Sequence, residues 1–335
     1  MAGYQFFDYL IIGEVRTEFI IDLANRSRPD VLGGSALYAA GGLRCWSDRI
    51  AVCGHSAAIH QSEIAKIEQK YLIDLSGIQF HNLIQDDRYF LGYITPQELF
   101  LENPVAFYAS RGLPFPRGLI GYDPIENHQP GMMGSKFLPE DFSNRCLEAG
   151  SCLICPFDLM THLQLTSFLL QSGIKRLVIQ SSANYMKMDE FENMPVLMKD
   201  LGGFITPSSQ LRSLFRNRSK DLWEMAATLG SLGCAAILVY DERFGVNLYE
   251  TSTGKRYQMP PYPGDISDPT GMPEAFCGGF LAGLKLSQDP REALAYGAVS
   301  ASLTSEGSGP FYCLESLPSL VQSRLNFARD MIKAV

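Results

Sequence analysis

Long apolar runs and blocks of like charge are missing from this sequence. It contains no run of 18 apolar residues, and its first residues, MAGYQFFDYLIIG, show neither the basic segment nor the small-residue cleavage site of a signal peptide. No block of like charge is long enough to indicate a disordered tail. These absences argue against a membrane protein or a secreted protein. We expect a cytoplasmic chain that is folded nearly from end to end.

Motifs that bind metals are also scarce. The 8 cysteines and 5 histidines are scattered along the chain. Cys152 and Cys155 form a CxxC motif, but it lies in the apolar stretch SCLICPFD, and no second Cys or His pair completes a site. We therefore expect buried, reduced thiols and no metal site, and the sequence gives no sign of a histidine-based catalytic triad.

An excess of positive charge, typical of proteins that bind nucleic acid, is absent. The chain carries 28 Lys and Arg residues against 36 Asp and Glu residues, a formal net charge of −8. One basic cluster occurs, at Arg212, Arg216, Arg218 and Lys220, and no aromatic residues alternate with it as a base-stacking surface would require. We expect no nucleic-acid partner.

Extended apolar segments alternate with amphipathic ones along most of the 335 residues. The alternation predicts a parallel sheet with helices on both faces. The expected strands are 6–12, 16–23, 49–53, 152–155, 175–179, 203–205 and 235–240, with a glycine turn at Gly13 between the first two. The expected helices are one capped by Ser35 and others at 61–71, 160–172, 192–199, 207–215, 221–232, 273–286, 290–304 and 317–333.

Residues 84–133 differ from this pattern, with mixed polar and aromatic content and then frequent Pro and Gly. We expect two strands followed by a long irregular segment, the kind of segment that often forms a lid or a binding loop. No internal repeat and no linker divides the chain. We therefore predict one domain, 1–335, with a small added layer from about 13–32 and 84–133.

The stretch DPTGMPEAFCGGF, residues 268–280, leads from a Thr-Gly corner into a helix. An anion site at a helix start favours small residues with free backbone N–H groups, yet Met272 and Pro273 occupy the middle of this corner. A purely structural interpretation also fits, in which Thr270 or Asp268 caps the helix and Glu274 complements the helix dipole.

Several stretches, taken together and in order, resemble the ribokinase or PfkB family of carbohydrate and nucleoside kinases. The resemblance covers nearly the whole chain. Its landmarks are Gly13 followed five positions later by Glu18, GGSALYAA at 33–40, LGCAAILVYDERFGVNLY before the last strands, DPTGMPEAFCGGF at 268–280 and ASLTSEGSG at 301–309. The resemblance implies a three-layer α/β/α sandwich with a small β lid, substrate between lid and sheet, and ATP at the carboxyl ends of the strands.

The resemblance also implies roles for individual residues. They are Gly271 and Glu274 in catalysis, Glu18, Gly33, Gly34 and Tyr38 near the substrate, and Gly245, Thr270 and Gly307 near the nucleotide. For Glu18 a second interpretation stays open, in which it faces water from an edge strand. ATP and Mg²⁺ are the cofactors if the protein is active, and a sugar or nucleoside is the implied class of ligand.

Three departures affect the family signature D-[ST]-T-G-A-G-D-x-F-x-x-G. Met272 replaces Ala, Pro273 replaces Gly and has no N–H to donate, and Glu274 replaces the catalytic Asp. Loss of one such donor costs on the order of 10²–10³ in turnover in other enzymes. The longer Glu274 side chain moves the carboxylate by roughly an ångström, which costs about 10²-fold. Together these changes predict a degraded phosphoryl-transfer motif.

A fourth departure lies at Tyr240-Asp-Glu-Arg-Phe-Gly245, where the family has a Lys/Thr-x-Gly-x-x-Gly turn and this chain keeps only the last Gly. Asp241 and Glu242 would bring negative charge near the ATP phosphates, or would form a solvated hairpin turn.

Three functional hypotheses follow. The first is a catalytically impaired ligand-binding, regulatory or assembly subunit. The second is an active ATP-dependent kinase of a small sugar, polyol or nucleoside, with Glu274 as general base. The third is hydrolysis of a nucleoside or sugar phosphate in the same pocket. A homodimer through lid strands or a protein partner is also expected, with the alternative that the 95–133 segment caps the lid edge.

Overall fold

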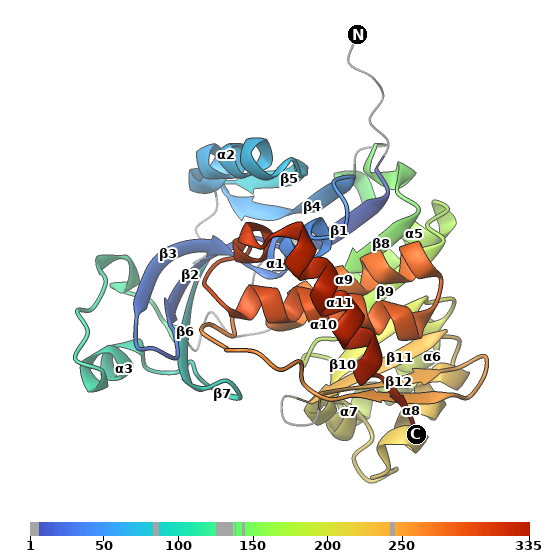
Figure 1. The fold of residues 1–335 in the computed structure, drawn as a ribbon. Coiled ribbons are helices and arrows are strands. Elements are labelled where there is room, and N and C mark those ends of the chain that lie inside the picture. Colours follow the sequence, from blue (N-terminus) through green and yellow to red (C-terminus); the bar gives the residue numbers. More distant parts are fainter. Residues whose placement is uncertain (1–6, 83–86, 125–136, 138, 143–144, 242–244) are drawn as a thin grey trace.

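The structure, a computed structural model, describes residues 7–82, 87–124, 137, 139–142, 145–241 and 245–335. Within these residues, a ten-stranded sheet forms the centre of the molecule (Figure 1). The strand order is β14 (Lys333–Ala334), β13 (Arg256–Met259), β12 (Gly245–Glu250), β11 (Ala236–Asp241), β10 (Gly203–Pro207), β9 (Arg176–Gln180), β8 (Ser151–Ile154), β1 (Tyr9–Glu14), β4 (Ile50–Ala57) and β5 (Asp74–His81).

The strands from β11 to β5 are parallel, and β12, β13 and β14 continue the sheet in antiparallel pairing. Successive strand residues point to opposite faces, so Tyr9 and Ile11 belong to one core cluster and Leu10 and Ile12 to the other. A strand covered on both faces must be apolar at every position, and the run YLII meets that requirement.

Helices cover both faces of the sheet and complete three layers. One layer contains α1 (Ser35–Arg44), α2 (Gln61–Tyr71), α9 (Met272–Ser287), α10 (Pro290–Ser305) and α11 (Pro318–Met331). The other contains α5 (Leu159–Gln171), α6 (Met194–Met198), α7 (Ser208–Leu214) and α8 (Leu222–Ser231). The predicted α/β/α sandwich is confirmed.

A second sheet forms the small lid, which stands to one side of the main sheet (Figure 1). Its strand order is β3 (Ser27–Gly33), β2 (Arg16–Ile21), β6 (Arg88–Thr95) and β7 (Glu98–Phe100). Phe19 and Phe90 on one face pack against α3 (Pro104–Ser110) and the segment after it. On the opposite face, Leu91 and Tyr93 turn toward the body of the protein. The parts 84–86 and 125–133 of the predicted lid region lie outside the described residues.

The predicted glycine turn at Gly13 is wrong. Gly13 lies inside β1, and the chain leaves the main sheet for the lid at Val15. Strands β1 and β2 therefore belong to different sheets. A Cβ atom at Gly13 would lie 2.8 Å from Ser35 Oγ and 3.0 Å from Ala36 N, so the glycine is needed because α1 begins directly against the strand.

The predicted cap of α1 is also wrong. Gly34 occupies the N-cap position with φ 94°, a conformation that favours glycine, and no side chain caps the helix. Ser35 is instead the first helical residue, and its Oγ accepts a hydrogen bond from Glu14 N at 3.1 Å. The hydroxyl thus joins the end of β1 to the start of α1.

Strands β3 and β5 and helix α3 were not predicted individually. Both strands lie at sheet edges, and the sequence DLSGIQFH of β5 mixes buried and half-exposed positions without a clear period. Strand β3 contains Pro29 and Asp30, residues that are depleted in strands and tolerated at an edge. Hydrophobic periodicity is weak in these two strands because most of their positions are only partly buried.

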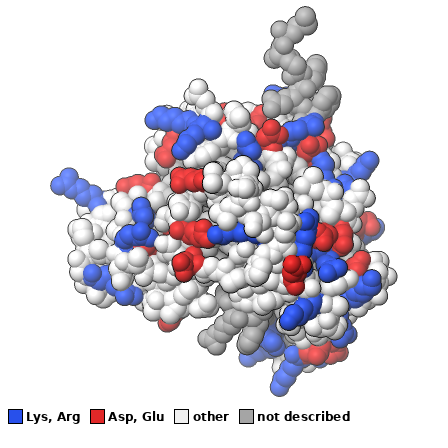
Figure 2. Space-filling model, viewed as in Figure 1, with Lys and Arg blue, Asp and Glu red and all other residues white. Residues whose placement is uncertain are grey.

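No helix in the described part of the chain has both the length and the apolar character needed to cross a membrane. On the face drawn in Figure 2, Lys and Arg side chains are interspersed with Asp and Glu side chains. Among the described cysteines, Cys152 and Cys155 are free and fully buried, as core thiols are.

His162 is buried near the start of α5 and stabilises the turn that follows β8 through hydrogen bonds. Its Nε2 donates to the Cys155 carbonyl at 2.9 Å, and its Nδ1 contacts the Tyr185 hydroxyl at 2.9 Å. Burial lowers the pKa of His162 from 6.5 to about 4, against the opposing influence of the Cys155 carbonyl and Asp158. The imidazole is therefore neutral in the folded protein near neutral pH.

We predict that this histidine makes the protein less stable in acid. The unfolded chain takes up a proton near pH 6.5 and the folded one only near pH 4, so stability present above pH 6.5 is lost as the pH falls toward 4. The loss is about 2 kcal/mol between pH 8 and pH 5. Urea unfolding of the protein and of His162→Gln at both pH values measures it. An equal pH dependence in the two proteins would contradict the prediction.

Candidate functional site

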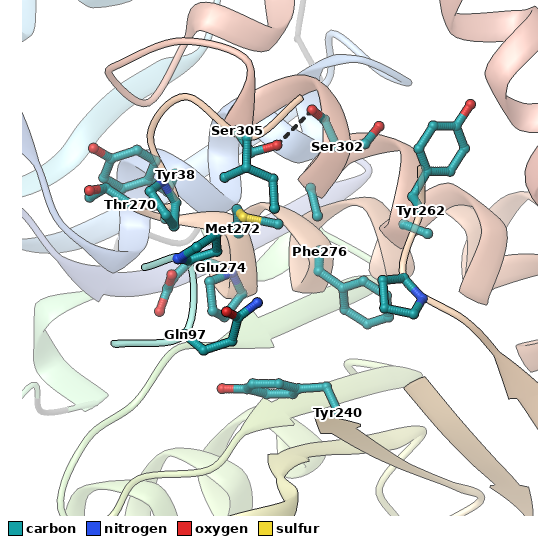
Figure 3. Close-up of a pocket in the computed structure, with 18 of the residues that line it drawn as sticks. Tyr38, Gln97, Tyr240, Tyr262, Thr270, Met272, Glu274, Phe276, Ser302 and Ser305 are labelled. Carbon is teal, nitrogen blue, oxygen red and sulfur yellow. Dashed lines mark hydrogen bonds between the residues drawn. The ribbon is translucent and has the colours of Figure 1, made fainter. Parts of the chain in front are cut away.

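A cavity of about 490 Å³ opens between the lid and the body. It lies at the carboxyl ends of parallel strands, since Glu14 ends β1, Pro156 follows β8 and Tyr240 lies near the end of β11. Open α/β sheets commonly bind ligands at this edge. In Figure 3, Tyr38, Thr270 and Glu274 lie on one side of the cavity, and Phe276 and Tyr262 lie on the other.

Glu18 forms the centre of a buried hydrogen-bond network at the lid side. Its side chain is fully buried, and β2 is an inner strand of the lid sheet, so the interpretation that it faces water from an edge strand is wrong. Its Oε1 accepts from Gly34 N at 3.1 Å, and its Oε2 accepts from the Tyr38 hydroxyl at 3.0 Å. A Cβ atom at Gly33 would lie 2.3 Å from Glu18 Oε2. The Glu18 carboxylate therefore leaves no room for a side chain at position 33.

Arg16 and Glu14 add charge beside this network. Arg16 Nε donates to Glu18 Oε1 at 3.0 Å, and its guanidinium lies 4.0 Å from the ring centroid of Tyr89. Burial raises the pKa of the half-buried Glu14 carboxyl above its usual value, and the nearby Arg16 charge opposes that shift. The sequence analysis did not single out either residue, although Glu14 ends β1 and Arg16 begins β2.

The turn before α9 is held by a different set of contacts from those predicted. Gly271 is the N-cap residue with φ 74°, and no side chain caps the helix, so the predicted cap by Thr270 or Asp268 is wrong. Asp268 Oδ1 accepts from Thr270 N at 3.0 Å, and its Oδ2 accepts from Ser308 Oγ at 2.5 Å. Thr270 Oγ1 donates to the Tyr93 hydroxyl at 3.2 Å, which links the turn to the lid.

The first turn of α9 offers few backbone donors to a ligand. Met272 N donates to Pro269 O at 3.2 Å, and Pro273 has no N–H. The N–H of Glu274 hydrogen-bonds its own carboxylate, an interaction that lowers the pKa of that group. A helix start normally presents three or four free N–H groups, so this one is depleted as an anion site.

Glu274 is half-buried beside the cavity, and its Oε1 accepts from Gln180 Nε2 at 3.1 Å. Burial raises the pKa of Glu274 above its usual value, although its own N–H, Gln180 and Arg16 oppose the shift. A carboxylate with a raised pKa is a stronger base than an exposed one, so Glu274 is chemically suited to accept a proton.

The other half of the cavity is largely apolar. Phe276 and Tyr262 line it together with the segment Met259-Pro260-Pro261. Tyr240 contributes from the end of β11 (Figure 3). Asp241 lines the same half, and its Oδ2 accepts from Ser208 Oγ at 2.8 Å. Glu242, which was expected beside it, lies outside the described residues.

The structure brings most of the predicted site residues to this one cavity. Its lining includes Glu18, Gly34, Tyr38, Gly245, Thr270, Gly271 and Glu274. Gly33 and Gly307 are not among the lining residues; Gly307 packs under Tyr312, whose ring would lie 2.3 Å from an added Cβ atom. Gly245, with φ 86°, lets the hairpin pass close to Met259 O, 2.0 Å from an added Cβ. Its glycine requirement is thus structural.

No group of three or more His, Cys, Asp or Glu side chains that could hold a metal ion occurs within the residues that the structure describes. Mg²⁺ in nucleotide sites usually keeps several waters and uses one or two carboxylates plus substrate phosphates. Asp241 and Glu274, which both line the cavity, are carboxylates of that kind.

Comparison with known proteins gives structural matches only. No family model matches the chain, and no curated protein sequence matches it. A protein from E. coli described as a ribokinase II, solved with ATP and Mg²⁺, matches with a TM-score of 0.69 and 12% identity, over 96% of this chain and 99% of that chain. The nucleoside kinase of Burkholderia thailandensis in complex with ADP and inosine matches with a TM-score of 0.69 and 14% identity, over 96% and 95%.

A third match is the aminoimidazole riboside kinase of Salmonella enterica, with a TM-score of 0.64 and 14% identity, over 95% of this chain and 99% of that chain. Coverage of nearly the whole length in each case shows that this chain has the ribokinase fold. The predicted fold type is confirmed, and at 12–14% identity the likeness establishes the fold alone.

We predict that Gly271→Ala destabilises the protein strongly. An added Cβ atom would lie 2.0 Å from the ring of Tyr38, and the left-handed backbone adds strain. The matched control is Gly254→Ala, because Gly254 has φ 67° with nothing within 4 Å. The control should lose about 1–2 kcal/mol of unfolding free energy, and Gly271→Ala about 1–3 kcal/mol more. Chemical denaturation of both variants tests this, and equal losses would refute the packing role of Tyr38.

Proposed function

We propose that this chain is a divergent member of the ribokinase family that binds a small polar ligand under its lid and transfers phosphoryl groups very poorly. A buried, preorganised hydrogen-bond network at the cavity wall supports the proposal of ligand binding. Its members are Glu18, Gly34 and Tyr38. The ligands named for the fold relatives are nucleosides and ribosides, so a sugar or nucleoside type of ligand is the class we propose here.

One observation carries the proposal of impaired transfer, namely the depleted donor set of α9. Met272 N is used by Pro269 O, Pro273 has no N–H, and Glu274 N is turned to its own carboxylate. Removing a single donor that stabilises developing charge costs on the order of 10²–10³ in turnover. Met272 also places a thioether side chain at this corner (Figure 3).

The charge of the cavity supports the same proposal. Its described lining contains four acidic residues, Glu14, Glu18, Asp241 and Glu274, and one basic residue, Arg16. Arg16 is already engaged by Glu18. The phosphates of ATP would meet carboxylates with little compensation, so bound Mg²⁺ would have to offset most of the repulsion.

An active ATP-dependent kinase is the second candidate. It is favoured by the position of Glu274 at the cavity, by the raised pKa that suits a general base, and by the ATP and Mg²⁺ bound to one fold relative. In that case Glu274 would accept the proton of the attacking hydroxyl group, and ATP with Mg²⁺ would supply the phosphoryl group.

A cytoplasmic location and assembly through the lid belong to this proposal as well. The α3 segment covers one face of the lid sheet, while β3 and β7 are its outer strands. Outer strands expose backbone groups that pair readily with another chain. Dimerisation through them would close the lid edge of the cavity.

We predict that restoring the turn restores transfer. The triple variant Met272→Ala, Pro273→Gly, Glu274→Asp regains the N–H at position 273, loses the Met272 thioether side chain and has the shorter base, so its rate of ADP release with ATP, Mg²⁺ and a panel of sugars and nucleosides should rise by at least about 10²-fold. The control is the same variant with Asn at position 274, which should lose the gain. Phosphate release without ADP, from sugar and nucleoside phosphates, tests the hydrolase alternative.

Turnover of the unmodified protein at about 1–100 per second, the usual range for kinases, would overturn the proposal of impaired transfer. A nucleotide titration adds a second measurement. Tight binding of ATP without turnover would indicate a nucleotide-sensing protein.

A further inference from the structure

The apolar half of the cavity offers a ligand few hydrogen-bond donors and no positive charge. Phe276 and the segment 259–262, which ends in Tyr262, form its wall on the body of the protein (Figure 3). Pro260 and Pro261 have no backbone N–H. Arg16, in the polar half, is the one Lys, Arg or His residue in the described lining of the whole cavity. This wall therefore lacks the charged donors that hold a phosphate group.

The serine hydroxyls of α10 that line the cavity already donate within their own helix. Ser302 Oγ donates to Val299 O at 2.9 Å, and Ser305 Oγ donates to Ser302 O at 2.9 Å (Figure 3). A nucleobase carries several donors and acceptors on its edge, and each one that is buried without a partner weakens binding. A group without polar atoms has no such requirement, so it suits this wall better than a base does.

The two aromatic side chains of the wall are held in place by their neighbours. A Cβ atom added at Gly297 of α10 would lie 2.9 Å from the Phe276 ring, so this ring packs directly on the α10 backbone. The Tyr262 ring meets Phe327 edge to face, with centroids 5.9 Å apart, and the Arg324 guanidinium lies 5.7 Å from the Tyr262 centroid. An apolar group can pack against this preorganised wall without rearranging it.

The lid shows the same change from charged to apolar residues. Glu18 lies on β2, Tyr93 on the next strand, β6, and Leu99 on the outer strand, β7. Leu99 pairs directly with Tyr93, so both side chains lie on the same face of the lid sheet, and both line the cavity. Neighbouring strands are about 4.8 Å apart, which places the backbone of β7 roughly 10 Å from that of β2.

A sugar bound at the Glu18 network would by itself leave this apolar surface in water. Leu99 is 40% exposed, and Pro260 and Pro261 are exposed as well. The cavity volume of about 490 Å³ lies in the range of sites that enclose drug-sized ligands. Both halves belong to this one cavity, so a single molecule can reach from the charged network to the apolar wall.

We propose that the ligand is a glycoside with an apolar aglycone, such as an alkyl chain. Its sugar lies against the Glu18 network, and its aglycone lies between Leu99 of the lid and the wall formed by Phe276 and Tyr262. This inference rests on the proposed ligand-binding function of the cavity. It narrows the class of ligand from sugars and nucleosides in general to sugars that carry an apolar group.

Glycosides that differ only in the aglycone test this inference by calorimetry. The probes are the methyl and hexyl β-glycosides of glucose, galactose and ribose, at concentrations below micelle formation. Each fully buried methylene group raises affinity about fourfold, and the hexyl group has five more than the methyl group. Burial of half of them makes the hexyl glycoside of the sugar that binds at least about 30-fold tighter than its methyl counterpart.

Two variants locate the aglycone. Leu99→Asn and Tyr262→Ser should each reduce the preference for hexyl over methyl at least about 3-fold and leave the affinity for the methyl glycoside unchanged. The matched control is Leu320→Asn, because Leu320 is 42% exposed, lies on α11 and is not among the described lining residues. It should change neither affinity. If Tyr262→Ser does not fold, Leu99→Asn at its exposed position still decides the question.

The outcomes separate this inference from the function on which it rests. Equal affinities for the methyl and hexyl glycosides would overturn the inference and leave ligand binding intact. A hexyl preference that Leu99→Asn leaves unchanged would overturn it too, because the aglycone would then lie elsewhere. Displacement of the hexyl glycoside by ATP with Mg²⁺ would assign the apolar half to a nucleotide. Absence of binding by every probe at millimolar concentration would overturn the inference and the proposed sugar ligand together.

Discussion

The contact of the Tyr38 ring with the left-handed backbone of Gly271 holds the site together. Tyr38 projects from α1, its hydroxyl donates to Glu18 in the lid, and its ring leaves no room for a side chain on the turn before α9. One side chain thus fixes the relative positions of three elements, namely the lid, α1 and α9. Thr270 adds a second link from the same turn to the lid through Tyr93.

Ligand binding and phosphoryl transfer require different features of this site, and the chain has those for binding but lacks some of those for transfer. Binding needs a shaped cavity with oriented polar groups, which Glu18, Gly34 and Tyr38 provide. Phosphoryl transfer needs free donors aimed at developing charge, and Pro273 removes one while Met272 N is used within the turn. A proline at this position keeps the helix start intact and still removes a catalytic donor, because the first-turn N–H has no helical role.

Prediction from sequence succeeded where the physical signal was local and periodic. Apolar strands such as YLII and the amphipathic helices followed from their patterns, and the order of strands and helices led to the sandwich that the structure has. It failed where a glycine or hydroxyl served a distant neighbour. Gly13 was read as a turn although α1 packs against it, and Ser35 was read as a cap although it accepts from Glu14. Neither partner can be recognised from residues nearby in the chain.

The residue order alone was enough to define the layered architecture, the altered turn at 271–274 and the loss of an N–H at Pro273, because each depends on local chemistry. Only folding decided that Glu14 and Glu274, 260 positions apart in the sequence, share one cavity. The same holds for the buried state of Glu18 and for the exclusion of Gly307 from the cavity lining. Charge, burial and pairing at a site arise from elements that the chain brings together over long distances, and no local pattern encodes them.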